Sequence, residues 1–418
     1  MEISKQAGER SVPRGFGFTL ALAMGVGPLA LYTLNATSPL VTADLGLSRA
    51  EFGIFAMVAF LAAAIASPLV GRCADVFSSR VVLVVLFTGS ALALVGAAVA
   101  QSFGWLLLAV AVCGAVQALS NPVTNQLIAA HVPAGRRGPL MGLKQAGVQL
   151  SQFTAGLVLP TVAVLLGWRG AAAVAASVAV VGLLLVRGTV PDDAPATGVR
   201  HGRRLADLPA AVWWLTGYAL LTGAALQATN VYLPLYSFER LHLSVRVAGL
   251  TAAVVGSVGL VSRIGWGRGA DRMRDPYHPL FLLAIAGGLG VSAVLAAEHL
   301  HQPALMWAGA VVFGASGLAA NVVVMIALVH VSPVQVIGTA SGILAVGLYL
   351  GFALGPISFG LIADGIGYYT DGWLAVMATY AVAAVLALVW RAQRANGGAP
   401  VVPGEPDRAP VEAAQRSR

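Results

Sequence analysis

The chain has 418 residues, of which 58% are hydrophobic and only 10% are charged. This composition excludes an ordinary soluble domain of that length and indicates a protein that lies in a lipid bilayer. The formal net charge of +8 raises the separate question of a nucleic-acid partner.

Apolar segments recur along the chain, and each is long enough to cross a hydrocarbon core of ~30 Å as a helix. The eight tryptophans lie near the ends of these segments, as amphipathic rings do at a boundary between water and lipid. We therefore predict an all-α membrane protein. Its twelve transmembrane helices are expected at residues 16–38, 50–70, 80–101, 104–130, 139–165, 169–187, 210–237, 246–266, 278–297, 303–329, 335–362 and 372–391.

The placement of the basic residues answers the question raised by the charge. With the amino terminus in the cytoplasm, 19 of the 25 Lys and Arg residues fall in cytoplasmic loops and tails. Such a bias is the positive-inside asymmetry of a membrane protein rather than a phosphate-binding surface. We predict a multi-pass protein of the cytoplasmic (inner) membrane, with both termini in the cytoplasm and no nucleic-acid partner.

The chain contains an internal repeat. Residues 45–75 match residues 241–271, and residues 114–147 match residues 314–347 at a slightly longer spacing. Because six is an even number, both six-helix copies enter the membrane in the same sense, which is a parallel-repeat transporter plan. We expect two pseudo-symmetric bundles at 16–187 and 210–391, a cytoplasmic segment at 1–15, a cytoplasmic linker at 188–209 and a disordered cytoplasmic tail at 392–418.

The most distinctive part of the repeat is a charged phrase, GRCADVFSSR from Gly71 and GRGADRMRDP from Gly267. These phrases resemble the signature between helices 2 and 3 of the Major Facilitator Superfamily, and the resemblance covers residues 14–392. It implies a latch at the cytoplasmic face that stabilises the state open to the outside, with Gly allowing close helix approach and Asp pairing with Arg. The implied gating residues are Gly71, Asp75, Arg80, Gly267, Asp271 and Arg272.

Lys144 and Arg263 are the only basic residues within predicted spans, and no acidic residue lies deep in one. A charge inside a membrane indicates a functional site by default. The place of Arg263, four residues before Gly267, resembles helix 8 of the superfamily's monocarboxylate and oxalate carriers, where an Arg binds the substrate carboxylate. Alternatively, either side chain could extend to water at the cytoplasmic end of its helix.

The remaining candidate residues are polar positions on the faces of predicted helices. We interpret the protein as a secondary active transporter of a small organic anion, a mono- or dicarboxylate, driven by a proton or counter-anion gradient; the alternative is an efflux transporter for amphipathic compounds or drugs. The sequence predicts no enzyme, cofactor, metal site or ATP-binding loop, and a monomer. Substrate-binding candidates are Arg263, Lys144, Gln145, Gln149, Asn121, Asn125, Asn35, Tyr32, Gln227, Asn230 and Tyr349.

Overall fold

The structure, a computed structural model, describes residues 13–191, 208–269, 275, 277–333, 336–365 and 368–396, and it contains no strand in these ranges. Helices account for almost all of them. They are α1 (Phe16–Ala36), α2 (Ser38–Leu45), α3 (Arg49–Val76), α4 (Ser79–Ala98), α5 (Phe103–Gln117), α6 (Ser120–His131), α7 (Ala134–Thr189), α8 (Ala210–Glu239), α9 (Val245–Gly269), α10 (Tyr277–His299), α11 (Pro303–Val331), α12 (Ile337–Gly365) and α13 (Tyr369–Asn396). The predicted all-α class is confirmed.

The thirteen helices correspond to the twelve predicted spans once three differences are taken into account. The first span continues into α2, and the fourth is divided into α5 and α6 near Ala118. The fifth and sixth spans form the 56-residue helix α7, which turns sharply at Gly167 with φ 73°. A positive φ is cheap only for glycine, so this residue allows two spans to follow one another without a loop.

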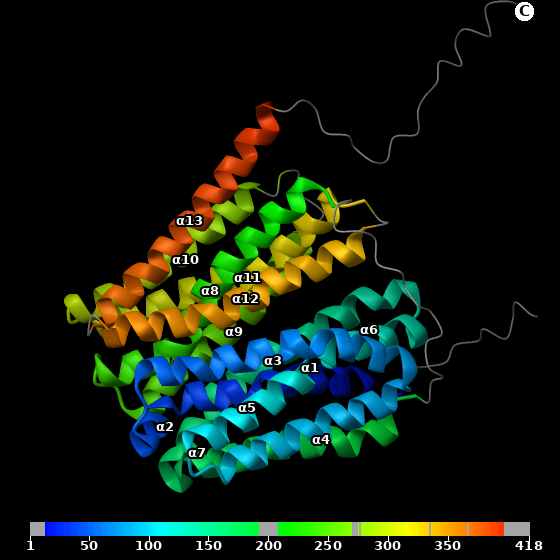
Figure 1. Ribbon diagram of the computed structural model, residues 1–418, viewed down its shortest axis with the longest axis horizontal. Coiled ribbons are helices and arrows are strands. Elements are labelled where there is room, and N and C mark those ends of the chain that lie inside the picture. The colour runs from blue at the N-terminus through cyan, green and yellow to red at the C-terminus, as the bar shows by residue number, and fades with distance from the viewer. Residues whose placement is uncertain are drawn as a thin grey trace, which may run out of the picture.

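Two bundles lie side by side, the first containing α1 to α7 and the second α8 to α13 (Figure 1). We call the end of the bundles that contains Phe16, Thr189 and Ala210 the termini face, and the end that contains Gly46 and Gly167 the far face. In Figure 1 the bundles meet on the left, beside α2, and diverge to the right.

Glycine permits the closest helix contacts within each bundle. A methyl group placed on Gly147 of α7 would lie 2.0 Å from the Ala21 carbonyl oxygen of α1. In the second bundle, one placed on Gly355 of α12 would lie 2.1 Å from the Ala224 carbonyl oxygen of α8. These contacts pack α1 against α7 and α8 against α12, which is how small residues act in membrane interfaces.

The same kind of contact joins the two bundles, but only over part of their length. A methyl group on Gly156 of α7 would lie 2.4 Å from the Ala253 nitrogen of α9, and one on Gly53 of α3 would lie 2.7 Å from the Pro356 oxygen of α12. Nearer the termini face, a methyl group on Gly142 of α7 or Gly265 of α9 would have no atom within 4 Å. The bundles are therefore closed at the far face and separated at the termini face.

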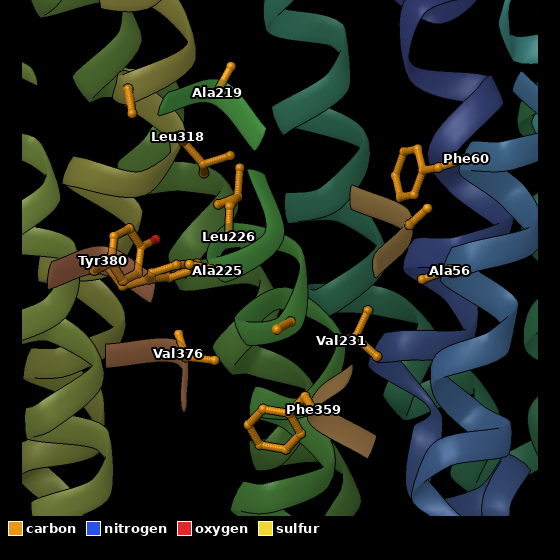
Figure 2. Close-up of a cluster of buried hydrophobic side chains, with 14 of the residues drawn as sticks. Ala56, Phe60, Ala219, Ala225, Leu226, Val231, Leu318, Phe359, Val376 and Tyr380 are labelled. Atoms are coloured by element: carbon orange, nitrogen blue, oxygen red, sulfur yellow. The ribbon is translucent and has the colours of Figure 1, made fainter. Parts of the chain in front are cut away.

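An apolar cluster fills the closed part of the interface. Phe60 of α3 packs against Tyr349 and Phe352 of α12, at centroid distances of 6.2 and 4.9 Å. In Figure 2 the cluster continues from Ala56 and Phe60 of α3 into the interior of the second bundle, where it includes Phe359 and Tyr380. Aromatic rings provide large contact areas, so this region holds the far ends of the bundles together.

Candidate functional site

Arg263 lies where α7 and α9 begin to separate. Its side chain is half-buried, and its Nε donates a hydrogen bond to the Leu318 carbonyl oxygen of α11 at 3.0 Å. Its Nη1 donates to Gln149 Oε1 of α7, also at 3.0 Å. The guanidinium of the second bundle is thus bonded to an amide of the first.

A second polar contact crosses the interface one helical turn along α7. Gln152 Nε2 donates to Asn230 Oδ1 of α8 at 3.2 Å, and Asn230 Nδ2 lies 3.4 Å from Gln227 Oε1. Gln152 is 2% exposed, and its own Oε1 has no hydrogen-bond partner among the described residues. Positions 149 and 152 share a helical face, so α7 presents two glutamines to the opposite bundle.

Lys144 does not extend to water, although that was one interpretation of its position. Its side chain is only 1% exposed and turns toward α6. The Nζ donates to Thr124 Oγ1 at 3.0 Å and to the Oδ1 atoms of Asn121, at 3.4 Å, and Asn125. All three acceptors are neutral, so none of them supplies a negative charge to balance the lysine.

The other predicted residues are divided between the interface and its surroundings. Tyr32 and Asn35 lie one turn apart on α1, and both amide atoms of Asn35 are buried with no hydrogen-bond partner in the described part of the chain. Tyr349 belongs to the apolar cluster, where it stacks on Phe60. Gln145 is exposed on α7. The structure therefore brings together Arg263, Gln149, Asn230 and Gln227, and separately Lys144, Asn121 and Asn125.

A positive charge lies near an opening on α9. A shallow pocket of about 290 Å³ is lined by Ser262, Gly265 and Trp266, which are neighbours of Arg263 along α9, and Arg263 itself does not line it. Among the described residues, no carboxylate forms an ion pair with Arg263 or Lys144. The arrangement can hold a small anion, because a guanidinium offers a planar pair of donors for two oxygens.

The far face is closed by a group of charged and aromatic residues, which we call the far-face cluster: Arg49, Glu239, Asp364 and Tyr369. Arg49 Nη2 lies 3.0 Å from Glu239 Oε2, and the Arg49 guanidinium carbon is 4.6 Å from the centre of the Tyr369 ring. The Asp364 carboxylate accepts hydrogen bonds from the backbone nitrogens of Arg49, at 3.3 Å, and Ala50, at 2.7 Å.

This cluster spans the two bundles, and the sequence analysis did not find it. Arg49 starts α3 of the first bundle, whereas the other three members belong to α8, α12 and α13. Asp364 thus caps a helix of the opposite bundle. Sequence patterns on single helices gave no signal for contacts between such distant residues.

The predicted gating residues can be followed only in part. The structure describes only the helical backbone at Gly71 and Asp75, and Asp271 and Arg272 lie outside the described residues. Gly267 is in the last turns of α9, and Arg80 Nη2 donates to the Val190 carbonyl oxygen at 2.7 Å. The predicted segment 1–15, linker and tail also lie largely outside the described ranges.

Comparisons with known proteins cover most of the chain. A family model described as Major Facilitator Superfamily matches residues 20–356. The probable nitrate/nitrite transporter NarK2 of Mycobacterium tuberculosis is 28% identical over 403 residues, covering 88% of this chain and 95% of that protein.

Solved structures share the fold at low sequence identity. A bacterial homologue of the human lysosomal transporter Spinster, in an inward-facing and occupied conformation, superposes with a TM-score of 0.76 at 15% identity, covering 91% of this chain and 97% of that one. A D-xylose-proton symporter gives a TM-score of 0.71 at 17% identity, covering 89% and 97%.

Proposed function

Since the chain belongs to the Major Facilitator Superfamily, we propose that this membrane transporter is a secondary active carrier of a small anion with a planar oxyanion group, such as a carboxylate. The family resemblance inferred from the charged phrases is thereby confirmed. The substrate class is our proposal.

The position of Arg263 carries this proposal. It is a half-buried cation at the boundary between the bundles, two residues before the open position at Gly265, and it has no carboxylate partner among the described residues. A fixed positive charge in a water-poor site favours anions and disfavours cations. The similarity to a probable nitrate/nitrite transporter supports an anionic substrate, because nitrate and nitrite are also small planar oxyanions.

We further propose that the termini face is cytoplasmic, so the structure corresponds to the inward-open state. Transport then consists of rocking one bundle against the other, which opens the far face and closes the termini face around Arg263. A proton or counter-anion gradient supplies the energy.

The test is uptake by purified protein in liposomes, with labelled acetate, oxalate and nitrate as probes and a cationic dye as the contrasting substrate. Arg263→Ala should abolish uptake of the anion that the parent carries. Arg246→Ala is the matched control, because Arg246 is exposed at the other end of the same helix. Dye transport that Arg263→Ala leaves unchanged, without anion uptake, would refute the proposal and favour efflux of amphipathic compounds.

A further inference from the structure

Only part of the Arg263 guanidinium is available to a substrate. Its Nε is bonded to a backbone carbonyl oxygen, that of Leu318, within the same bundle. Leu318 is 4% exposed and packs against Gly259, so this carbonyl is fixed by the core of the second bundle. A two-point grip on a planar oxyanion must therefore use the edge formed by Nη1 and Nη2.

Gln149 is bonded to one of the two nitrogens of that edge. Its Oε1 accepts from Nη1 at 3.0 Å, and its side chain is 1% exposed. Among the described residues, Nη2 has no hydrogen bond, so this nitrogen is available to an anion. An amide oxygen is a neutral acceptor, whereas the oxygen of an anion forms a charge-assisted bond that is roughly twice as strong.

From these contacts we infer that Gln149 is a positioning residue that competes with the substrate. In the empty carrier its amide takes the place of one substrate oxygen on Nη1. An arriving oxyanion binds Nη1 and Nη2 together and displaces the Gln149 side chain. This inference rests on the proposed function, because it needs an anion at Arg263.

Displacement has a conformational consequence because the bond joins the two bundles. The Arg263–Gln149 bond lies where the close packing of α7 and α9 ends: a methyl group on Gly256 of α9, nearer the far face, would lie 2.8 Å from the Phe153 nitrogen, whereas one on Gly265 would have no described atom within 4 Å. Substrate binding thus removes one link between the bundles at the depth where they pivot. The empty carrier is held in the observed state more firmly than the loaded one.

The second bridge, between Gln152 and Asn230, provides an internal comparison. It also crosses the interface, but it joins two neutral amides and leaves the guanidinium untouched. If both glutamines only hold the bundles together, Gln149→Ala and Gln152→Ala should change the dissociation constant of the anion in the same way. If Gln149 competes for Arg263, only Gln149→Ala should lower it.

The experiment measures the dissociation constants of acetate, oxalate and nitrate by titration calorimetry of the purified full-length protein, and KM and kcat for uptake into liposomes. Gln149→Ala removes a competing acceptor, and the free energy gained by the anion is about that of one net hydrogen bond. This variant should therefore lower Kd and KM by about two- to tenfold. Gln149→Glu places a permanent carboxylate on Nη1 and should raise Kd by more than about tenfold. Gln152→Ala should leave Kd within about twofold of the parent value. Thr154→Val, exposed on the same helix, is the control for substitution itself.

The outcomes separate the two proposals. If Arg263→Ala binds these anions as the parent does, the proposed function fails. If Arg263→Ala loses binding while Gln149→Ala binds more weakly than the parent or equally well, the proposed function stands. In that case Gln149 assists substrate binding or has no effect on it, and Gln149 does not compete with the substrate for Arg263.

Discussion

Replacing Asp364 with alanine should shift this carrier toward the state that is open at the far face. The Asp364 side chain is 27% exposed, and its carboxylate accepts from the Arg49 and Ala50 nitrogens and lies 3.7 Å from Arg49 Nη1. These interactions exist only while the bundles touch. They cap the first turn of α3, whose third backbone N–H is already satisfied by Ser48 Oγ at 3.1 Å.

The magnitude follows from the three contacts. The 2.7 Å bond from Ala50 is short and charge-assisted and contributes about 1.5 kcal/mol. The longer bond and the partly exposed ion pair with Arg49 add about 0.5 kcal/mol together. A loss of about 2 kcal/mol corresponds to a roughly 30-fold change in the ratio of the two states.

Double electron–electron resonance between nitroxides at Gln101 and Arg246, exposed residues on different bundles at the far face, would measure that ratio. Asp364→Ala should increase the long-distance population. Asp44→Asn is the matched control, because Asp44 is also an ion-paired acid at this face, but its partner Arg169, at 2.7 Å, belongs to the same bundle. A distance distribution that Asp364→Ala leaves unchanged, or that Asp44→Asn shifts equally, would refute the reasoning.

Three further predictions concern packing, the buried lysine and pH. Gly147→Ala should lower the free energy of unfolding by about 1–3 kcal/mol and with it the thermal unfolding temperature. Gly142→Ala, with open space around it, should change neither. Equal unfolding temperatures for the two variants would contradict this. Lys144→Met should unfold no earlier than the parent, since a buried ammonium with neutral partners stabilises little, but should raise the KM for the anion; an unchanged KM in liposome uptake would exclude a role for this charge. The Trp168 indole hydrogen bond lowers the pKa of Asp44 below its ordinary 3.8, so this carboxylate stabilises the fold above that pH and ceases to do so as the pH falls through the lowered value. Thermal melts of the parent and Asp44→Asn should therefore converge below about pH 4, and a constant difference down to pH 2 would count against this.

The fold could be predicted because it depends on features that are local or repeated. Each span is a long apolar run, and the matching glycines revealed two copies of one unit. The corner at Gly167 falls in the gap between the predicted spans 139–165 and 169–187. The break between α5 and α6 was not predicted, because the apolar run continues across it and the division depends on local backbone geometry.

The candidate site could be predicted only one helix at a time. Helical periodicity placed Asn121 and Asn125 on one face, and both indeed contact Lys144. The pairing of Gln149 with Arg263 connects residues 114 positions apart on different bundles, and nothing in either segment specifies the partner. The far-face cluster was not predicted for the same reason, because Asp364 and Arg49 are 315 positions apart.

The corner at Gly167 has a mechanical consequence. Lys144 and Gln149 lie on one arm of α7, and the other arm ends at Thr189, next to the connection between the bundles. Trp168 and Arg169 fasten the corner to Asp44 with hydrogen bonds of 3.1 and 2.7 Å. Because the two arms are joined directly at Gly167, a tilt of the first arm also tilts the second. A ligand that moves Gln149 by a small angle is thereby expected to displace the start of the connecting segment on the opposite side of the membrane from the corner.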